Sequence, residues 1–199
     1  MKFCIVGAGA IGGLLGTRLA LAGEDVTFIA RRANLAAINA HGFRLIGDDG
    51  AESVATTVRA VEQMADAGEP DAVLLTVKAH QVRELLPDLA TLVGPRTMLV
   101  TMINGVPWWY FQRLGGEFDG RVLDSVDPGG ELAAALPAER LIGSIVYPAA
   151  ELVAPGVVRL IEGTRGTLGG LDGRRSERTE ALSKALKGAG PEAPVAKDN

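Results

Sequence analysis

Short apolar runs alternate along the first hundred residues with segments whose apolar residues recur at helical spacing. The run 3–6 stops at a glycine, as buried parallel strands do, and the residues from 10 to 21 then predict a helix that Gly23 closes. The same alternation predicts helices over 34–40 and 81–92. It predicts strands over 25–30, 42–47, 51–61, 71–77 and 97–102.

The order of these elements indicates an α/β fold. Strands that alternate with helices are typical of a Rossmann-type, doubly wound and mostly parallel sheet, and the nearly continuous apolar run 71–77 suits a central strand. After about residue 120 the connections are rich in glycine and proline, while 121–125, 141–147 and 157–161 still resemble strands. We therefore predict an antiparallel extension of the sheet.

The end of the chain follows another pattern. Apolar spacing predicts an amphipathic helix from about Ser176 that stops at Gly190-Pro191, and the tail after it has no closing element. We predict a dinucleotide-binding domain over 1–172. Residues 173–199 are expected to lead toward a helical second domain that the sequence lacks.

The most specific motif lies between the first predicted strand and the first predicted helix, which is the context in which G-x-G-x-x-G binds a dinucleotide. The first glycine permits a tight turn, the second lets the backbone approach a pyrophosphate, and the third lets the helix pack closely. The helix N-terminus then faces the anion. The motif consists of Gly7, Ala8, Gly9, Ala10, Ile11 and Gly12.

The end of the second predicted strand narrows the choice of cofactor. An acidic residue there favours NAD, whereas a basic residue accommodates the 2′-phosphate of NADP. Arg31 and Arg32 follow this strand, and no carboxylate stands at the position. Since Arg31 offers a two-pronged donor to a phosphate, we expect NADPH as the cofactor. The alternative is a pair of solvated arginines at a helix start.

Two polar residues follow neighbouring predicted strands. Lys78 comes after 71–77, and Asn104 comes after 97–102. Ligands of open α/β sheets bind beyond the carboxyl ends of the strands, so both are candidates for the site. A lysine that only extends to solvent and a simple Asn-Gly turn are the alternatives.

The remaining candidates carry less weight. His41 stands in a predicted turn, and His80, near Lys78, fits a solvated helix start better than an acid–base catalyst. Two histidines and one cysteine without ligand spacing argue against a metal site. The aromatic cluster 108–111 follows Pro107, a favourable first helical residue, and is expected to pack in the core. The alternative is that part of the cluster is exposed where a second domain is absent.

Charge and composition exclude several classes of function. The net charge of −4 provides no basic field for nucleic acid or an anionic membrane. No window approaches the length of an apolar membrane span. Cys4 is the single cysteine and forms no internal disulfide, which predicts a cytoplasmic protein.

In this order the motifs resemble those of the ketopantoate reductase (2-dehydropantoate 2-reductase) family. The resemblance covers essentially the whole chain, and it implies an oxidoreductase that reduces ketopantoate to pantoate with NADPH, on the route to pantothenate and coenzyme A. The segments that carry it are 7–12, Arg31, 77–81, 104–107, 127–130, 142–143, 155–158 and 168–169.

The resemblance also implies a role for each motif. Residues 7–12 would hold the pyrophosphate, Arg31 the 2′-phosphate and Lys78 the cofactor, with Asn104 between nicotinamide and substrate. Family members carry a catalytic lysine and a substrate-binding glutamate in a helical second domain, and we expect that lysine beyond Asn199. No catalytic residue is assigned within the chain, because three lysines near its end do not match the setting: Lys184, Lys187 and Lys197.

Other functions stay open at this stage. One is a non-catalytic NADP-binding sensor or interaction module, and another is a related reductase of a different keto acid or an imine. As partners we expect a small 2-keto acid, neither nucleic acid nor a membrane, and a second copy of the chain if a second-domain surface is left uncovered.

Overall fold

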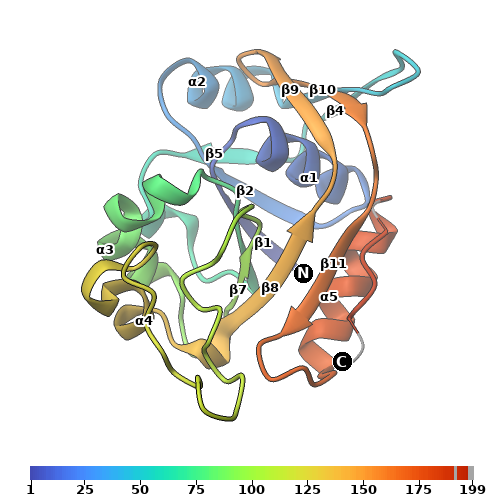
Figure 1. The fold of residues 1–199 in the computed structure, drawn as a ribbon. Coiled ribbons are helices and arrows are strands. Elements are labelled where there is room, and N and C mark those ends of the chain that lie inside the picture. The colour runs from blue at the N-terminus through green and yellow to red at the C-terminus, as the bar shows by residue number, and fades with distance from the viewer. Residues whose placement is uncertain (191, 197–199) are drawn as a thin grey trace.

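The computed structural model describes residues 1–190 and 192–196, and its centre is a seven-stranded sheet in the order β11-β8-β7-β6-β1-β2-β5 (Figure 1). All neighbours are parallel except β8 and β11, which are antiparallel. The predicted doubly wound, mostly parallel sheet with an antiparallel addition is therefore confirmed. Its strands are β1 (Lys2–Val6), β2 (Asp25–Ile29), β5 (Arg59–Val61), β6 (Ala72–Leu75), β7 (Met98–Thr101), β8 (Leu141–Val146) and β11 (Gly166–Gly170).

Apolar side chains leave this sheet on both faces. In β1, Phe3 and Ile5 join the core on the side of α1 (Ala10–Leu21), while Cys4 and Val6 join the core on the side of α3 (Val82–Leu92). The short helix α4 (Glu131–Ala135) lies on the α3 side (Figure 1). Because both faces are covered, the strands read as continuous apolar runs.

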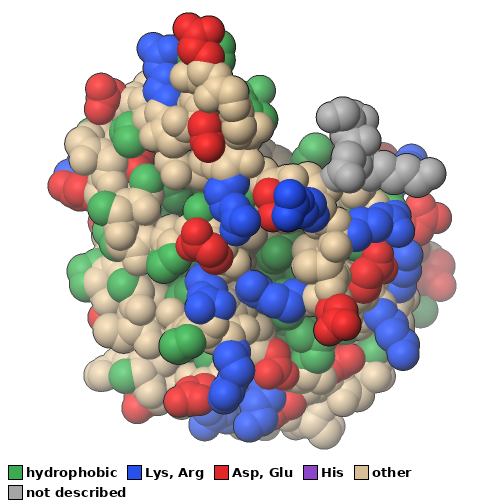
Figure 2. Space-filling model, turned by 90° about the horizontal axis from the view of Figure 1, so that it is seen from below, with side chains coloured by type: hydrophobic (Ala, Val, Ile, Leu, Met, Phe, Trp, Pro, Cys, Tyr) green, Lys and Arg blue, Asp and Glu red, His purple; other side chains and the backbone are tan. Residues whose placement is uncertain are grey.

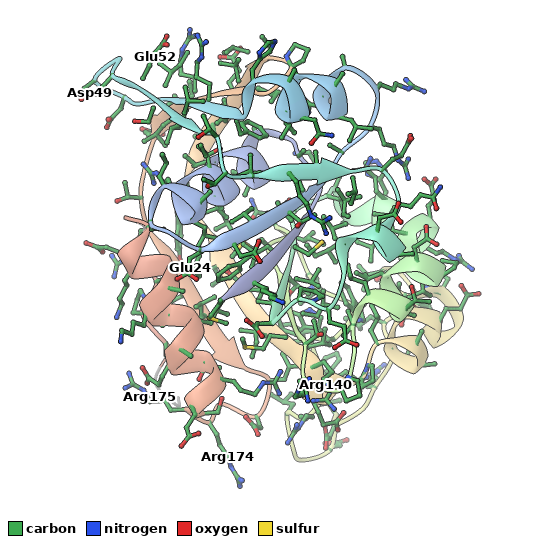
Figure 3. The ribbon with its side chains drawn as sticks, turned by 180° about the vertical axis from the view of Figure 1, so that it is seen from behind. Glu24, Asp49, Glu52, Arg140, Arg174 and Arg175 are labelled. Atoms are coloured by element: carbon green, nitrogen blue, oxygen red, sulfur yellow. The ribbon has the colours of Figure 1, made fainter. Side chains whose placement is uncertain are left out.

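A second sheet of four strands, in the order β4-β3-β10-β9, packs on the far side of α1. One hairpin follows α2 (Arg32–His41), the other follows β8, and the two hairpins join through the parallel pair β3 and β10. Figure 3 shows Asp49 and Glu52 at the projecting end of the first hairpin. The strands are β3 (Phe43–Ile46), β4 (Glu52–Ala55), β9 (Ala149–Ala154) and β10 (Val157–Glu162).

Three predictions about the elements are wrong. The segment 51–61 is not one strand, because it divides into β4 and β5 in different sheets. Residues 121–125 form no strand: 121–123 are irregular and 124–126 form a turn, where the amides of Val126 and Asp127 donate to the Leu123 carbonyl. The segment 157–161 forms β10 of the second sheet and so does not extend the first, and the strands β9 and β11 were not predicted.

The aromatic cluster 108–111 after Pro107 is divided between the core and the surface. Its residues form turns and no helix, although Trp108 is buried in the core as expected. Tyr110, by contrast, is exposed. A good first helical residue is not sufficient where no amphipathic pattern follows it.

The chain ends in α5 (Glu177–Gly188), which begins after Ser176 as predicted. The Ser176 side chain accepts a hydrogen bond from the Thr179 amide at 3.2 Å, and Leu182 and Leu186 are buried in the α1 core. Residues 192–196 then run beside β11, while Pro191 and Lys197 lie outside the described residues.

No helix within the described ranges is long and apolar enough to cross a membrane. On the face seen from below in Figure 2, basic and acidic side chains are interspersed, so no field of one sign covers that face.

Candidate functional site

A wide cleft opens where the strand order reverses, between the carboxyl ends of β1 and β6. Doubly wound sheets bind their ligands at this switch point. The loop after β1 and the residues after β6 face each other across a volume of about 470 Å³. Its walls include the predicted residues Gly7, Ala8, Gly9, Ala10, Ile11, Arg31 and Lys78, together with Asn34, Thr76 and Gln81.

The three glycines of the motif meet different surroundings. Gly7 has a φ of +108°, a conformation that side-chain-bearing residues rarely adopt. A Cβ on Gly9 would meet nothing within 4 Å, so the backbone there leaves room for a ligand. A Cβ on Gly12 would lie 2.0 Å from the Gly7 carbonyl oxygen, which makes Gly12 a packing residue outside the cleft wall.

The N-terminus of α1 is open toward this loop. Gly9 caps it without a side-chain hydrogen bond, and no acidic residue stands in the first turn. The first amides of a helix lack intrahelical partners and carry a partial positive charge. The arrangement therefore fits the phosphates of a dinucleotide.

Two side chains that the sequence analysis did not select, Thr76 and Asn34, form hydrogen bonds to the loop. The Thr76 hydroxyl lies 2.8 Å from the Gly7 carbonyl oxygen and 3.1 Å from that of Val6, so it donates to this pair of acceptors. Asn34 Nδ2 donates to the Ala8 carbonyl at 2.7 Å. Neither residue belongs to a recognised local motif, and only tertiary folding brings them to the loop.

Arg31 stands at the outer wall of the cleft, directly before α2. Its backbone is extended and its side chain is exposed. Arg32 follows with a φ of +52°, a left-handed conformation that is uncommon for a residue with a side chain. Within the described residues neither guanidinium forms an ion pair, so both charges are available to an anion.

Lys78 and Asn104 come together beside the cleft, as their positions after neighbouring strands predicted. Both line an adjoining cavity of about 140 Å³ with Ile11 and Thr76. Asn104 also lines a cavity of about 230 Å³ that contains exposed His80 and buried Trp108. His41, the last residue of α2, belongs to none of these cavities.

Asp127 of the segment 127–130 is a structural residue. Its buried carboxylate accepts hydrogen bonds from the amides of Leu132 and Ala133, at 2.9 and 3.0 Å. Gly129 and Gly130 both have positive φ, so the predicted turn is present. The motif therefore secures the start of α4.

The lone cysteine takes no part in the site. Burial raises the pKa of the Cys4 thiol to about 12, which keeps it protonated and unreactive. Across residues 1–190 and 192–196, no three His, Cys, Asp or Glu side chains are grouped as a metal site would require.

Comparison with known proteins agrees with this geometry. The model of the family "Ketopantoate reductase PanE/ApbA" matches residues 3–110, which include the glycine loop, Arg31, Lys78 and Asn104. The chain belongs to this family. A 2-dehydropantoate 2-reductase of Mesorhizobium japonicum is 49% identical over 199 residues, which are all of this chain and 60% of that relative.

Solved structures of ketopantoate reductases share the fold. A Ralstonia solanacearum MolK2 protein assigned as a ketopantoate reductase superposes with a TM-score of 0.91 at 40% identity, over 98% of this chain and 60% of that one. A D-mandelate dehydrogenase solved with NADH and anilino(oxo)acetate has a TM-score of 0.77 at 24% identity, over 98% and 57%. The chain thus spans about 60% of the length of its ketopantoate reductase relatives.

Proposed function

We propose that this chain forms the NADPH-binding part of a reductase that converts a small 2-keto acid, most specifically ketopantoate, to its 2-hydroxy acid. The observation that carries the proposal is the cleft at the switch point. Its walls bring together the glycine loop, a helix N-terminus without a side-chain cap, Arg31 and Lys78. The named function of the relatives supports the substrate class.

The residues of the cleft fit the phosphates of the cofactor through their positive charge and the open space at Gly9. The open space at Gly9 would receive the pyrophosphate, and the Arg31 guanidinium would pair with the 2′-phosphate. Lys78 would contact the nicotinamide half, with Asn104 between it and the substrate. When bound, the cofactor supplies a hydride. The residues of this chain bind and orient it.

A second candidate is a non-catalytic NADP-binding module. It is supported by the fact that the chain spans 60% of the length of a reductase relative. Reduction of a keto group develops negative charge on its oxygen, which requires a positive charge or a proton donor nearby. That group need not lie in the 60% that the chain spans. We propose that residues 1–199 alone bind the cofactor without turnover. Ketopantoate-dependent NADPH oxidation by the purified chain at a rate comparable with the full-length relatives would contradict this.

Arg31→Ala tests the choice of cofactor. Loss of charge-assisted hydrogen bonds should weaken NADPH binding about 10- to 100-fold and NADH binding by less than about threefold. Arg96→Ala is the control, because Arg96 is exposed and lies at the amino end of β7, whereas the cleft opens at the carboxyl ends of the strands. Equal losses for the two cofactors would remove Arg31 from the proposed 2′-phosphate site.

A further inference from the structure

Asn34, in the first turn of α2, forms hydrogen bonds through both ends of its side-chain amide. Nδ2 donates to the Ala8 carbonyl of the glycine loop at 2.7 Å, and Oδ1 accepts from the Gly156 amide at 2.8 Å. One partner requires a donor and the other an acceptor, so the orientation of the amide is determined. The residue is half-buried and lines the proposed cofactor cleft.

The contact with Ala8 controls the shape of the loop. In a trans peptide the carbonyl and the following N–H point in opposite directions, so holding the Ala8 oxygen also fixes the Gly9 amide. Thr76 does the same for the Gly7 carbonyl on the other side. Both carbonyl oxygens stay engaged with protein donors, and neither is left free to repel a phosphate.

The contact with Gly156 extends this support to the second sheet. Gly156 lies in the turn between β9 and β10, with a φ of +69°, and its carbonyl accepts from the Arg44 amide of β3 at 2.8 Å. A Cβ at this position would approach the Ala37 Cβ of α2 to 3.3 Å. The turn is therefore seated closely against α2, and Asn34 connects it to the loop.

We infer that Asn34 is a positioning residue for the phosphate-binding loop, and that it makes the second sheet part of the support of the cofactor site. The inference rests on the proposed function, in that the loop is taken to bind a dinucleotide. It assigns no chemistry to Asn34, which acts through the backbone of the loop.

The same helix provides a matched control. Asn39 Nδ2 donates to the Ala60 carbonyl at 2.9 Å, and its Oδ1 accepts from the Ala60 amide at 2.8 Å. It therefore fastens α2 to β5 with an equal number of hydrogen bonds but lies outside the cleft wall. Asn34→Leu and Asn39→Leu each remove two such bonds without changing charge.

Binding of NADPH, NADH and adenosine 2′-monophosphate distinguishes a role of Asn34 in positioning the loop from a general role in stability. Asn34→Leu should raise the Kd of both NADPH and NADH about tenfold, because the pyrophosphate is common to them. The Kd of adenosine 2′-monophosphate, which has no pyrophosphate, should change by less than about twofold. Asn39→Leu should leave all three unchanged. Equal effects of the two variants, or equal losses for the mononucleotide and the dinucleotides, would overturn the inference.

Hydrogen exchange without ligand provides an independent measurement. The amides of residues 8–12 should exchange faster in Asn34→Leu than in Asn39→Leu, and equal exchange would overturn the positioning role. If the wild-type chain bound neither dinucleotide, the proposed function would fail, while the exchange comparison would still decide the role of Asn34. If Asn34→Leu does not fold, Asn34→Asp with Asn39→Asp replaces the pair.

Discussion

Gly9 and Gly12 belong to one motif, yet the space around their Cα atoms differs. The space beside Gly9 is open to the cleft, while Gly12 faces the Gly7 carbonyl and the Thr76 hydroxyl, to which a Cβ would approach within 2.0 and 2.5 Å. Gly9 therefore leaves space for the proposed ligand, and Gly12 allows the close contact between α1 and the strands.

Alanine substitutions at Gly9 and Gly12 should distinguish the space needed for a ligand from the space needed for packing of α1. Gly12→Ala should lower the free energy of unfolding by about 3 kcal/mol, because the backbone and the hydrogen-bonded Thr76 hydroxyl must move. Gly9→Ala should change it by less than about 1 kcal/mol but weaken NADPH binding, because the methyl group occupies the approach to the loop. Urea unfolding and cofactor titration measure both. A stable Gly12→Ala protein would contradict the packing role.

The order of residues along the chain was sufficient to predict many of the residues that line the cleft proposed for the cofactor. The glycine pattern, Arg31, Lys78 and Asn104 each begin within three residues of the end of a strand, so their place at the carboxyl ends of the strands follows from the sequence. Asn34 and Thr76 could not be found in this way, because their contacts join positions 26 and 69 residues apart.

Among the elements, α1 has the most unusual position, since it is packed between the two sheets. Its small residues allow large rings to approach from both sides. A Cβ on Gly13 would meet the Phe43 ring of β3 at 2.5 Å, and one on Gly16 would meet the Phe28 ring of β2 at 2.4 Å. Most residues of the helix are accordingly buried and apolar, with Thr17 and Arg18 as its polar members.

Phe43 should account for much of the attachment of the second sheet. Phe43→Ala removes a fully buried ring from the contact with Gly13 and should lower the free energy of unfolding by about 3–5 kcal/mol. Val54→Ala on β4, where the side chain is 40% exposed, should cost less than about 1 kcal/mol. Equal losses in urea unfolding would argue against Phe43 as the anchor.

The strands of the second sheet were the elements least predictable from the sequence. The segment 51–61 carries β-branched residues in both halves and no glycine or proline, so its composition does not show that β4 and β5 belong to different sheets. The parallel pair β3 and β10 joins segments far apart in the chain, and no local turn signals it. The central run 71–77 was predictable because burial on both faces leaves a continuous apolar signature.

For the molecule as a whole, the predicted division after residue 172 remains a prediction. Leu182 of α5 is fully buried in the same core as α1, which suggests a direct test. If 173–199 fold with the rest, Leu182→Ala should lower the free energy of unfolding by about 2–5 kcal/mol within a single transition. A separate early transition in calorimetry would instead support two units.

The most direct test of the proposed cofactor site is a titration of purified residues 1–199 with NADPH, in which binding is followed by energy transfer from the tryptophans to the cofactor. Trp108 lines a cavity that also contains Asn104, so the proposed nicotinamide site lies near a fluorophore. We predict saturable binding with a Kd of about 1–100 μM, tighter for NADPH than for NADH. No saturable signal with either cofactor up to millimolar concentration would contradict the assignment of the cleft.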